Sequence, residues 1–403
     1  MTSNSRVVVI GAGLAGVRLA RRLGELGTPA LLVGDEEHAP YNRVLLAEVL
    51  AGRYAPEVIA TPAPARTVRA RVTGIDRDQR AVICADGSRI AYGTLVLATG
   101  SNPVLPPLRG LFTPDHVLPA GVHAFRTMDD CLGLSEAVRP GVRAVVIGGG
   151  LLGVSAARAL ALRGAQVVLA QQAERLMERQ LDPAASALVH AHLAGLGVEI
   201  HTECRVRDVR CVGGAVRSVE MADGYALDAD LVVLACGVSP RAGLARDAGI
   251  DVGKGILVDD ELRTSDPHIH AIGDCAQHDG TVYGLTAPAY EQADALAALL
   301  AGDADSRYTG TRSLTRLTLS GHGPFDLAAF GETQPRPGDD VVQLADATRG
   351  TYRKVVVRDD RLVGGVLVGE LGTVGALARA WEGAEPLPDD GPLLHLLTND
   401  GGF

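Results

Sequence analysis

The chain has 403 residues, enough for two or three domains that each bury a core of their own. Hydrophobic residues make up 47% and charged residues 21%, the proportions of a soluble globular protein. The net charge of −10 argues against a nucleic-acid partner, and no apolar run reaches the length that spans a membrane. Residues 1–5 carry neither the basic head nor the apolar core of a secretory signal, so we expect a cytoplasmic protein.

Cysteine and lysine are sparse. Lysine occurs only as Lys254 and Lys354, which restricts any mechanism that needs a catalytic lysine to those two positions. None of the cysteines forms a C-x-x-C pair, and their spacing predicts no disulfide framework and no zinc or iron–sulfur site. We therefore expect no metal centre. The six cysteines are Cys84, Cys131, Cys204, Cys211, Cys236 and Cys275.

The first glycine motif follows an apolar run at residues 7–10, which is typical of a buried parallel strand. Gly11 permits a tight turn, Gly13 lets the backbone approach a pyrophosphate, and Gly16 lets the following helix pack on the strand. The helix begins at Leu14 and Ala15, and its free N–H groups and dipole favour an anion. The pattern predicts a dinucleotide site, with a plain strand–turn–helix as the alternative.

The second strand of this unit, residues 30–33, ends just before an acidic pair. Asp35 and Glu36 stand where a carboxylate holds a ribose hydroxyl in such folds. Pro40 then breaks the chain, and we expect a helix to start near Asn42. Arg43 is a candidate ligand for a pyrophosphate, since its planar fork matches phosphate oxygens; the alternative is a surface arginine.

A β-rich insertion follows. Residues 68–72 alternate as one strand, which would place Arg69 and Arg71 on one solvated face, and residues 82–84 and 89–91 flank a hairpin turn. Residues 94–97 predict a further buried strand, and it ends in Ala98, Thr99 and Gly100. Prolines then punctuate the chain, and we place a domain boundary near residue 115.

The second unit repeats the first. Residues 144–147 predict a strand that leads into Gly148, Gly150 and Gly153, again spaced as G-x-G-x-x-G, with a helix to about residue 163. Two nucleotide sites in one chain suit an enzyme that passes electrons between cofactors. Gln171 stands where the ribose-binding acid is expected. A carboxylate there would select NAD and nearby arginines would accommodate NADP; with only Arg175 close, we favour NADH.

The chain then returns to the first unit. Residues 227–237 contain one predicted buried strand, and residues 269–272 predict another that leads to Gly273 and Asp274. Asp274 stands where these sheets bind ligands, with a helix N-cap as the alternative. His270 is interpreted as a packed strand residue. A helix over residues 293–300, strands at 314–319, 351–358 and 362–368, and Trp381 in a core or interface complete the prediction.

Taken together, the two glycine motifs, Ala98–Gly100 and Gly273–Asp274 resemble the FAD-dependent pyridine nucleotide-disulfide oxidoreductase superfamily over about the first 310 residues. Residues 40–46, 125–130 and 176–182 look like the flavin module of NAD(P)H-dependent assimilatory nitrite reductase large subunits, with ferredoxin and rubredoxin reductases nearby. Residues 352–357 resemble a strand of the superfamily's C-terminal interface domain only loosely.

The resemblance implies an α/β fold with two Rossmann-like domains, for FAD and NAD(P), and a small α+β C-terminal domain. The expected boundaries are 1–115 and 241–311 for FAD, 116–240 for NAD(P), and 312–403 for the C-terminal domain, a candidate homodimer interface. It also implies roles for the motif residues. Gly11, Gly13 and Gly16 would hold the FAD pyrophosphate, Asp35 or Glu36 its ribose, Arg43 its phosphates and Asp274 its ribityl chain, while Gly148, Gly150 and Gly153 would hold NAD(P)H.

Departures from the resemblance bear on function. The chain has no redox-active cysteine pair, and residues 41–50 lack the single redox cysteine of other relatives. Ferredoxin reductases of the oxygenase type usually carry a lysine where this chain has Glu48. Because the chain stops at Phe403, before any siroheme domain, we expect it not to reduce nitrite to ammonia by itself.

Three functions therefore remain open. The favoured one passes hydride from NAD(P)H to FAD and electrons to a ferredoxin, a rubredoxin or a nitrate- or nitrite-reducing subunit, with no catalytic side chain. The second reduces a small molecule directly, such as a nitro or nitroso compound, a quinone or oxygen. The third is a non-catalytic subunit whose redox state controls an assembly.

Overall fold

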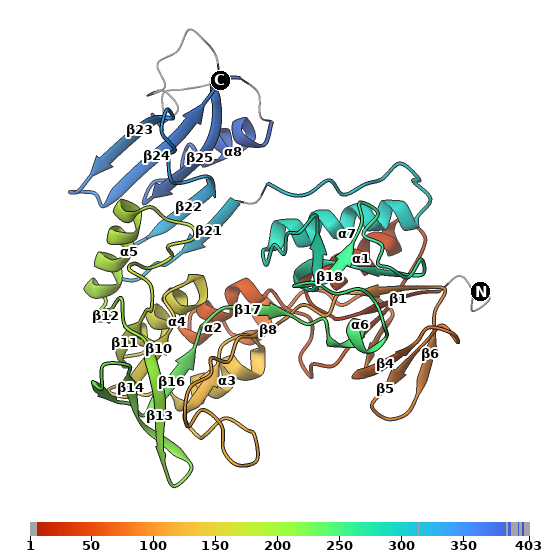
Figure 1. Cartoon of the computed structure of the whole chain (residues 1–403), viewed down its shortest axis with the longest axis horizontal. Helices are drawn as coiled ribbons and strands as arrows, with labels where there is room; N and C mark the ends of the chain where they lie inside the picture. The colour runs from red at the N-terminus through yellow and green to blue at the C-terminus, as the bar shows by residue number, and fades with distance from the viewer. Residues whose placement is uncertain (1–5, 313, 384–385, 388–393, 395–396, 399–403) are drawn as a thin grey trace. The chain divides into compact units, whose positions relative to one another are not determined.

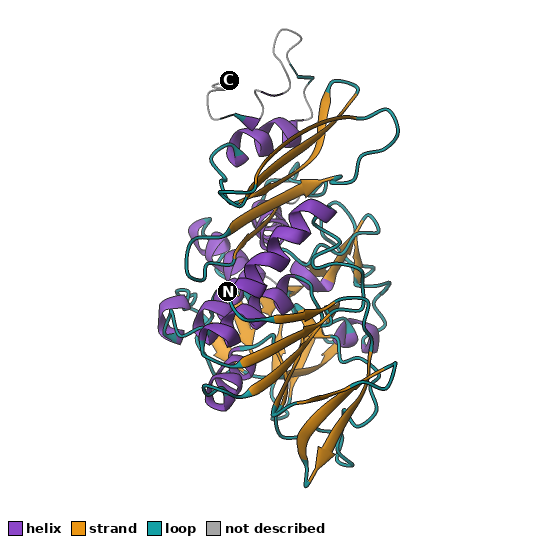
Figure 2. Cartoon of the chain, turned by 90° about the vertical axis from the view of Figure 1, so that its left-hand side faces the viewer, coloured by secondary structure: helices purple, strands orange, loops and turns teal. Residues whose placement is uncertain are grey.

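The computed structural model describes residues 6–312, 314–383, 386–387, 394 and 397–398, and it has a mixed α/β architecture (Figure 1 and Figure 2). The expectations about residues 1–5 and about the end at Phe403 lie outside the described residues. The chain forms two compact units. Unit 1 comprises Met1–Leu46, Tyr54–Asn102 and Val238–Ser313, and unit 2 comprises Ala47–Arg53, Pro103–Gly237 and Leu314–Phe403.

Unit 1 is built on a parallel sheet with the strand order β19-β7-β1-β2-β3. β1 lies in the middle and all four of its residues are buried, as its run of β-branched side chains predicts. The order places β19, from the last segment of the unit, beside β7 from its middle segment, and because the strands are parallel their carboxyl ends lie at one edge. The strands are β1 (Val7–Ile10), β2 (Leu31–Gly34), β3 (Thr67–Arg69), β7 (Thr94–Leu97) and β19 (Ile269–Ala271).

Two helices, α1 (Leu14–Glu25) and α7 (Thr286–Leu300), pack side by side in this unit (Figure 1). Their apolar faces join β1 in one buried cluster, and Arg18 Nε donates to Asp294 Oδ1 across the helix pair over 2.8 Å. α7 begins at Thr286, well before the predicted start at residue 293. The early start brings Gln292 into the buried part of the helix.

The insertion of unit 1 corrects one prediction. Residues 68–72 do not form one strand, because the chain breaks at Ala70 and Arg71: β3 joins the parallel sheet while β4 joins the small antiparallel one. Arg69 and Arg71 therefore do not share a strand face. The predicted hairpin is confirmed. This sheet contains β4 (Val72–Asp76), β5 (Ala81–Cys84) and β6 (Arg89–Ala91).

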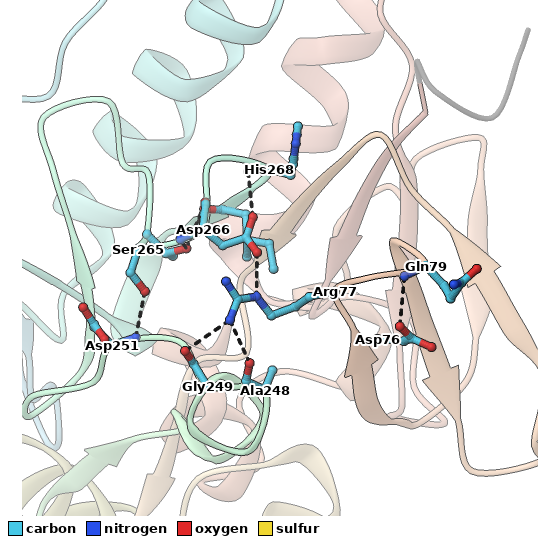
Figure 3. A network of polar contacts seen from close by, with 11 residues as sticks. Asp76, Arg77, Gln79, Ala248, Gly249, Asp251, Ser265, Asp266 and His268 are labelled. Atoms are coloured by element: carbon cyan, nitrogen blue, oxygen red, sulfur yellow. Dashed lines mark hydrogen bonds and ion pairs between the residues drawn. The ribbon is translucent and has the colours of Figure 1, made fainter.

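Arg77, just after β4, ties the small sheet to the segment that returns from unit 2 (Figure 3). Its Nε donates to Oδ2 of Asp266 over 2.6 Å, and its Nη1 donates to the carbonyls of Ala248 and Gly249 over 3.3 Å. The remaining elements of unit 1 are short. They are η2 (Arg43–Leu45), η3 (Pro56–Ile59), β8 (Ser101–Pro103) paired with β17 (Val238–Pro240), α6 (Gly243–Asp247), β18 (Ile256–Val258) paired with β20 (Ala276–His278), and η4 (Gly273–Cys275).

Unit 2 repeats the parallel architecture with the order β12-β11-β10-β16-β9. The buried strand predicted within residues 227–237 is confirmed as β16, which enters the parallel sheet, while β15 just before it belongs to a three-stranded antiparallel sheet. The elements are α2 (Leu46–Leu50), β9 (Val122–Ala124), α3 (Met128–Ala137), β10 (Arg143–Ile147), α4 (Leu151–Leu162), β11 (Gln166–Ala170), α5 (Pro183–Gly195), β12 (Glu199–His201), β13 (Val206–Val212), β14 (Ala215–Met221), β15 (Ala226–Asp228) and β16 (Leu231–Leu234).

The last part of unit 2 is an antiparallel sheet with the order β21-β22-β25-β24-β23 and one helix, α8. Three of its strands match the prediction, and Trp381 packs on Phe330 in the core, as expected. β22 and β23 were not predicted. The bounds are β21 (Leu314–Thr318), β22 (Asp326–Gly331), β23 (Asp340–Asp346), β24 (Thr351–Arg358), β25 (Arg361–Val368) and α8 (Val374–Gly383).

Buried polar contacts attach this sheet to the rest of unit 2. Nζ of Lys354 lies 2.8 Å from Oδ2 of Asp182, and the Tyr352 hydroxyl donates to the same oxygen over 2.6 Å. Asp182 also caps α5 by accepting from the Ala185 N–H. Burial opposes ionisation of Asp182, but these hydrogen bonds hold its pKa below the ordinary value. The carboxylate therefore joins β24 to the start of α5 as a buried ion.

Candidate nucleotide-binding sites

The first glycine motif forms a turn in which two glycines are required by contact distances. Gly11 has φ +111°, and a Cβ there would lie 2.1 Å from the carbonyl oxygen of Ala98. A Cβ on Gly16 would lie 2.0 Å from the oxygen of Gly11. Gly13 differs, because a Cβ on it would meet no described atom within 4 Å. The strand, turn and helix therefore pack tightly at Gly11 and Gly16, whereas Gly13 faces open space among the described residues.

The same turn leaves backbone donors free at the start of α1. Gly13 is the N-cap, and no side chain of the described structure caps the helix. Leu14 and Ala15 open the first turn, which contains no acidic residue. Uncapped N–H groups beside open space form an anion-binding cradle. A pyrophosphate fits this arrangement.

The acidic pair after β2 and Arg43 come together in unit 1. Glu36 forms an ion pair with the Arg43 guanidinium and accepts a hydrogen bond from the Tyr41 hydroxyl over 2.8 Å. The guanidinium carbon of Arg43 lies 5.0 Å from the centre of the Tyr41 ring. Burial alone would lower the pKa of Arg43, but Tyr41 and Glu36 raise it. Asp35 is exposed. Glu36, a candidate for the ribose, thus contacts Arg43, the candidate for the phosphates.

Asp274 lies just beyond β19, at the carboxyl edge of the parallel sheet. Its Oδ2 accepts a hydrogen bond from Ser101 Oγ over 2.9 Å, and Ser101 is 6% exposed. Asp274 is not a helix N-cap, because Ile272 occupies that position before η4. The neighbouring Gly273 donates its N–H to Oε1 of the buried Gln292 over 2.7 Å. These contacts hold the carboxylate in place, where it is suited to accept a hydroxyl.

Residues 98–100, also predicted to be part of the site, follow β7 at the carboxyl edge of the parallel sheet. Ala98 contacts the turn at Gly11, as described above. Thr99 Oγ1 donates to the carbonyl of Arg241 over 2.7 Å, and Gly100 accepts from the Arg241 N–H over 2.9 Å. Gly100 has φ +73°, a conformation that favours glycine. Ala98, Thr99 and Gly100 therefore support the turn and anchor the returning chain.

The second glycine motif has the same geometry in unit 2. Gly148 has φ +108°, and a Cβ there would lie 2.5 Å from the oxygen of Ala235. A Cβ on Gly153 would lie 1.7 Å from the oxygen of Gly148, whereas one on Gly150 would meet no described atom within 4 Å. Gly150 is the N-cap of α4, with no side-chain cap among the described residues. A second pyrophosphate fits here.

The Gln171 side chain, which stands where the ribose-binding acid is expected, contacts the second glycine turn. Its Oε1 accepts from the N–H of Gly149 over 2.7 Å, and its Nε2 lies 3.4 Å from the carbonyl oxygen of Arg175. Met177 donates its N–H to the oxygen of Gly149 over 2.9 Å. The loop after β11 is therefore fastened to the glycine turn. Gly149 was not singled out from the sequence; its place in three consecutive glycines was the available signal.

A buried arginine in α4 also went unpredicted. Arg158 has a side chain with no exposed surface, and it forms an ion pair with Glu48 and donates Nη1 to the Ser320 carbonyl over 2.8 Å. All three residues belong to unit 2. Glu48, the residue that departs from the ferredoxin reductase pattern, is thus neutralised by a fully buried cation.

The cysteines differ in exposure, and none of them forms a disulfide: Cys84, Cys131 and Cys275 are buried, Cys204 and Cys236 are partly buried, and Cys211 is exposed. Burial raises the pKa values of Cys236 and Cys275. His270 is buried in β19, and desolvation lowers its pKa to about 4. Among the described residues, no group of three or more His, Cys, Asp or Glu side chains is placed to hold a metal ion. No described helix has the length and apolar character needed to cross a bilayer.

Comparison with known proteins identifies the fold's relatives. Residues 5–293 match the family model "Pyridine nucleotide-disulphide oxidoreductase", and residues 315–382 match "Rubredoxin NAD+ reductase C-terminal domain". The loose resemblance noted for residues 352–357 therefore extends over most of the final sheet and α8.

Individual relatives agree. The assimilatory nitrate reductase electron transfer subunit of Bacillus subtilis (strain 168) is 35% identical over 91% of this chain and 48% of its own length. The probable ferredoxin reductase CtmF of Castellaniella defragrans is 32% identical, with 90% of each chain covered. A crystal structure of a ferredoxin reductase from Rhodopseudomonas palustris superposes with a TM-score of 0.80 at 30% identity, covering 91% of both chains.

The extent of these matches matters for function. The chain spans less than half the length of the first curated relatives it matches, 48%, 46% and 38% of them. The glycine turns, the parallel sheets and the family match over residues 5–293 nevertheless agree. This chain belongs to the pyridine nucleotide-disulphide oxidoreductase family.

Proposed function

We propose that this chain is an FAD-dependent NAD(P)H:acceptor oxidoreductase that passes electrons to a small electron-carrier protein or a terminal reductase subunit. The observation that carries the proposal is the pair of glycine turns. In each turn two glycines have no room for a Cβ, and the third faces open space at the start of a helix that no described side chain caps. Two such cradles in one chain suit a donor nucleotide and a nucleotide-linked redox group. When bound, FAD would accept a hydride and release electrons one at a time.

The residues of unit 1 fit the demands of FAD. Gly13 and the start of α1 would bind the pyrophosphate through backbone N–H groups. Asp274, oriented by Ser101, would accept a ribityl hydroxyl. Glu36 would bind the adenosine ribose while it orients Arg43 toward the phosphates, since it already contacts the guanidinium. Asp35 remains the second candidate for the ribose because it is exposed at the end of β2.

The residues of unit 2 would bind and orient NAD(P)H. Gly148, Gly150 and Gly153 would hold its pyrophosphate at the start of α4, and Gln171 would keep the turn in its binding shape through Gly149. The chain's part in the chemistry is orientation and exclusion of water, so no side-chain acid or nucleophile is required. The four expected segments, 1–115, 116–240, 241–311 and 312–403, are proposed as FAD, NAD(P), FAD and C-terminal domains.

The electron-carrier partner is proposed from the names of the relatives and from the cysteines. One relative is named an electron transfer subunit and another a probable ferredoxin reductase. None of the described cysteines forms a disulfide, which disfavours disulfide reduction through a cysteine pair. The proposed setting is the cytoplasm, with the C-terminal sheet as a homodimer contact.

A second candidate function rests on Glu48. Because an acid held by Arg158 stands where ferredoxin reductases usually carry a lysine, direct reduction of a quinone, a nitro or nitroso compound or oxygen is the alternative. A panel of such acceptors, assayed beside ferredoxin and rubredoxin, separates the two by turnover rate.

Anaerobic stopped-flow mixing tests the proposal. The FAD-loaded protein is mixed with NADH or NADPH, and the visible flavin band is followed. We expect rapid bleaching with at least one nucleotide, then recovery of the band on addition of a carrier protein. A preparation that takes up FAD yet bleaches with neither nucleotide contradicts the proposal.

A further inference from the structure

We propose that the final antiparallel sheet shapes the NAD(P)H site of its own chain, with Tyr352 and Lys354 as positioning residues that act through Asp182. This inference rests on the proposed function, because it takes the turn at residues 148–153 as the NAD(P)H site. It gives β24 a role within the chain, in addition to the dimer contact proposed for its sheet. The connection runs from β24 through Asp182 to the loop that follows β11.

The loop after β11, residues 171–181, lies directly against the second glycine turn. The Leu176 side chain is buried, and a Cβ built on Gly149 would lie 2.6 Å from its Cδ2 atom. Met177 donates its N–H to the Gly149 carbonyl over 2.9 Å. Because Gly149 is the middle one of three consecutive glycines, any displacement of this loop would also displace the backbone that is proposed to hold the pyrophosphate.

The loop needs support from outside itself. Met177 has a φ of +50°, in the left-handed region where the Cβ of a non-glycine residue is crowded. The Leu181 N–H donates to the Met177 carbonyl over 2.9 Å, so this turn closes at the residue just before Asp182. A backbone conformation of this kind persists only when the surrounding structure holds it.

The start of α5 supplies part of that support. Asp182 Oδ1 accepts from the Ala185 N–H over 3.0 Å and so caps the helix. Ser186, in the same first turn, donates its hydroxyl to the Leu176 carbonyl over 2.8 Å. The position of the loop therefore depends on where α5 begins. The helix itself packs beside the final sheet (Figure 1).

β24 supplies the partners of the other carboxylate oxygen, Oδ2 of Asp182. The Tyr352 hydroxyl donates to it over 2.6 Å, and Nζ of Lys354 lies 2.8 Å from it. The same Nζ donates to the Thr333 carbonyl over 3.0 Å. Tyr352 is 2% exposed and Lys354 6%, so water does not compete for these bonds. Charge-assisted bonds in such a setting are strong and directional, and through them β24 fixes the start of α5.

Isothermal titration calorimetry on the FAD-loaded protein measures nucleotide affinity without turnover, with 5′-ADP as the probe. We expect Tyr352→Phe to weaken 5′-ADP about threefold, since it removes one bond to the carboxylate and keeps the ring. Lys354→Met leaves that carboxylate buried without its cation, so it should weaken 5′-ADP about tenfold or more. The NADH concentration that gives half the maximal bleaching rate should rise by the same factors, while the maximal rate stays within about twofold.

Arg358→Gln is the matched control. It removes ion pairs with Glu332 and Asp339 from the last residue of the same strand. We expect it to lower the melting temperature and to leave the 5′-ADP affinity within about twofold, because these pairs do not involve Asp182.

A double-mutant cycle tests the connection through Asp182. Asp182→Asn keeps a side chain that can cap α5, but it leaves Lys354 without its anion. We expect this variant to weaken 5′-ADP as Lys354→Met does. The double variant should bind no more weakly than either single variant, because both changes remove the same interaction.

An unchanged 5′-ADP affinity in both Tyr352→Phe and Lys354→Met would overturn the proposal. Equal weakening by Arg358→Gln would do so too, since it would show a general loss of stability. The result is separable from the function proposed above. If NADH fails to bleach the flavin of the unmodified protein, the oxidoreductase proposal fails, whereas unchanged affinities in variants of a protein that NADH does bleach remove only the role of β24.

Discussion

The hydroxyl of Ser101 donates a hydrogen bond to Oδ2 of Asp274 over 2.9 Å, joining the segment after β7 to the segment after β19. The two residues lie 173 positions apart in sequence, in the second and third segments of unit 1. The parallel sheet brings them together because β7 and β19 are neighbours and both end at the same edge. The bond fixes the orientation of the Asp274 carboxylate at this edge of the sheet.

Asp274→Ala should weaken FAD retention about tenfold or more, because a hydrogen bond to a charged group contributes about 1.5–3 kcal/mol. Ser101→Ala should weaken it less, since that residue acts only by orienting Asp274. Ser88→Ala is the control: it removes a serine–aspartate bond from the exposed β5–β6 turn. Flavin fluorescence on dilution measures release, and equal retention in Asp274→Ala and Ser88→Ala would contradict the assignment.

Filling the cradle at Gly150 should abolish nucleotide binding without unfolding the protein. Gly150 has φ −81°, which valine tolerates, and a Cβ there meets no described atom within 4 Å. Gly150→Val should therefore keep FAD but slow bleaching by NADH at least about tenfold, since its side chain occupies the space of the phosphates. Gly195→Val, at another open position in unit 2, should bleach at the normal rate. Normal bleaching in both variants would show that nucleotide binds elsewhere.

The buried pair of Arg158 and Glu48 should be critical for the stability of unit 2. Arg158→Met removes a fully buried cation and leaves Glu48 without its main partner, which costs about 3–5 kcal/mol. Arg53 also faces Glu48, at 3.5 Å, but is 37% exposed, so Arg53→Gln should cost less than about 1 kcal/mol. Urea unfolding followed by circular dichroism compares the two variants, and equal midpoints would refute the distinction.

The link between Arg77 and Asp266 predicts a response to acid. Burial opposes ionisation of Asp266, but the His268 N–H and Arg77 hold its pKa below the ordinary value of about 3.9. A lowered pKa in the folded state stabilises the fold above about pH 3.9, and this stabilisation is lost as the pH falls through the folded-state pKa.

Arg77→Gln should therefore move the midpoint of acid unfolding to higher pH, with a cost at neutral pH of about 1 kcal/mol or less, because Arg77 is 37% exposed. Arg71→Gln, at an exposed position in the same insertion, should leave the midpoint unchanged. A pH titration followed by circular dichroism checks both, and coincident curves for the two variants would count against the link.

The sequence by itself determined the parts of the molecule that depend on neighbours along the chain. Both glycine turns, the buried strands before them, the β5–β6 hairpin and the family follow from short patterns, because a tight turn between strand and helix restricts which residues it accepts. The same local reasoning failed at residues 68–72, where a continuous pattern is divided between two sheets, and it also missed β22 and β23.

Only the tertiary structure decided which side chains meet. Ser101 with Asp274, Arg158 with Glu48, and Gln171 with the turn at Gly149 join segments that are distant in sequence. No periodicity encodes such pairs, since they depend on strand order and on which loops end at the same edge.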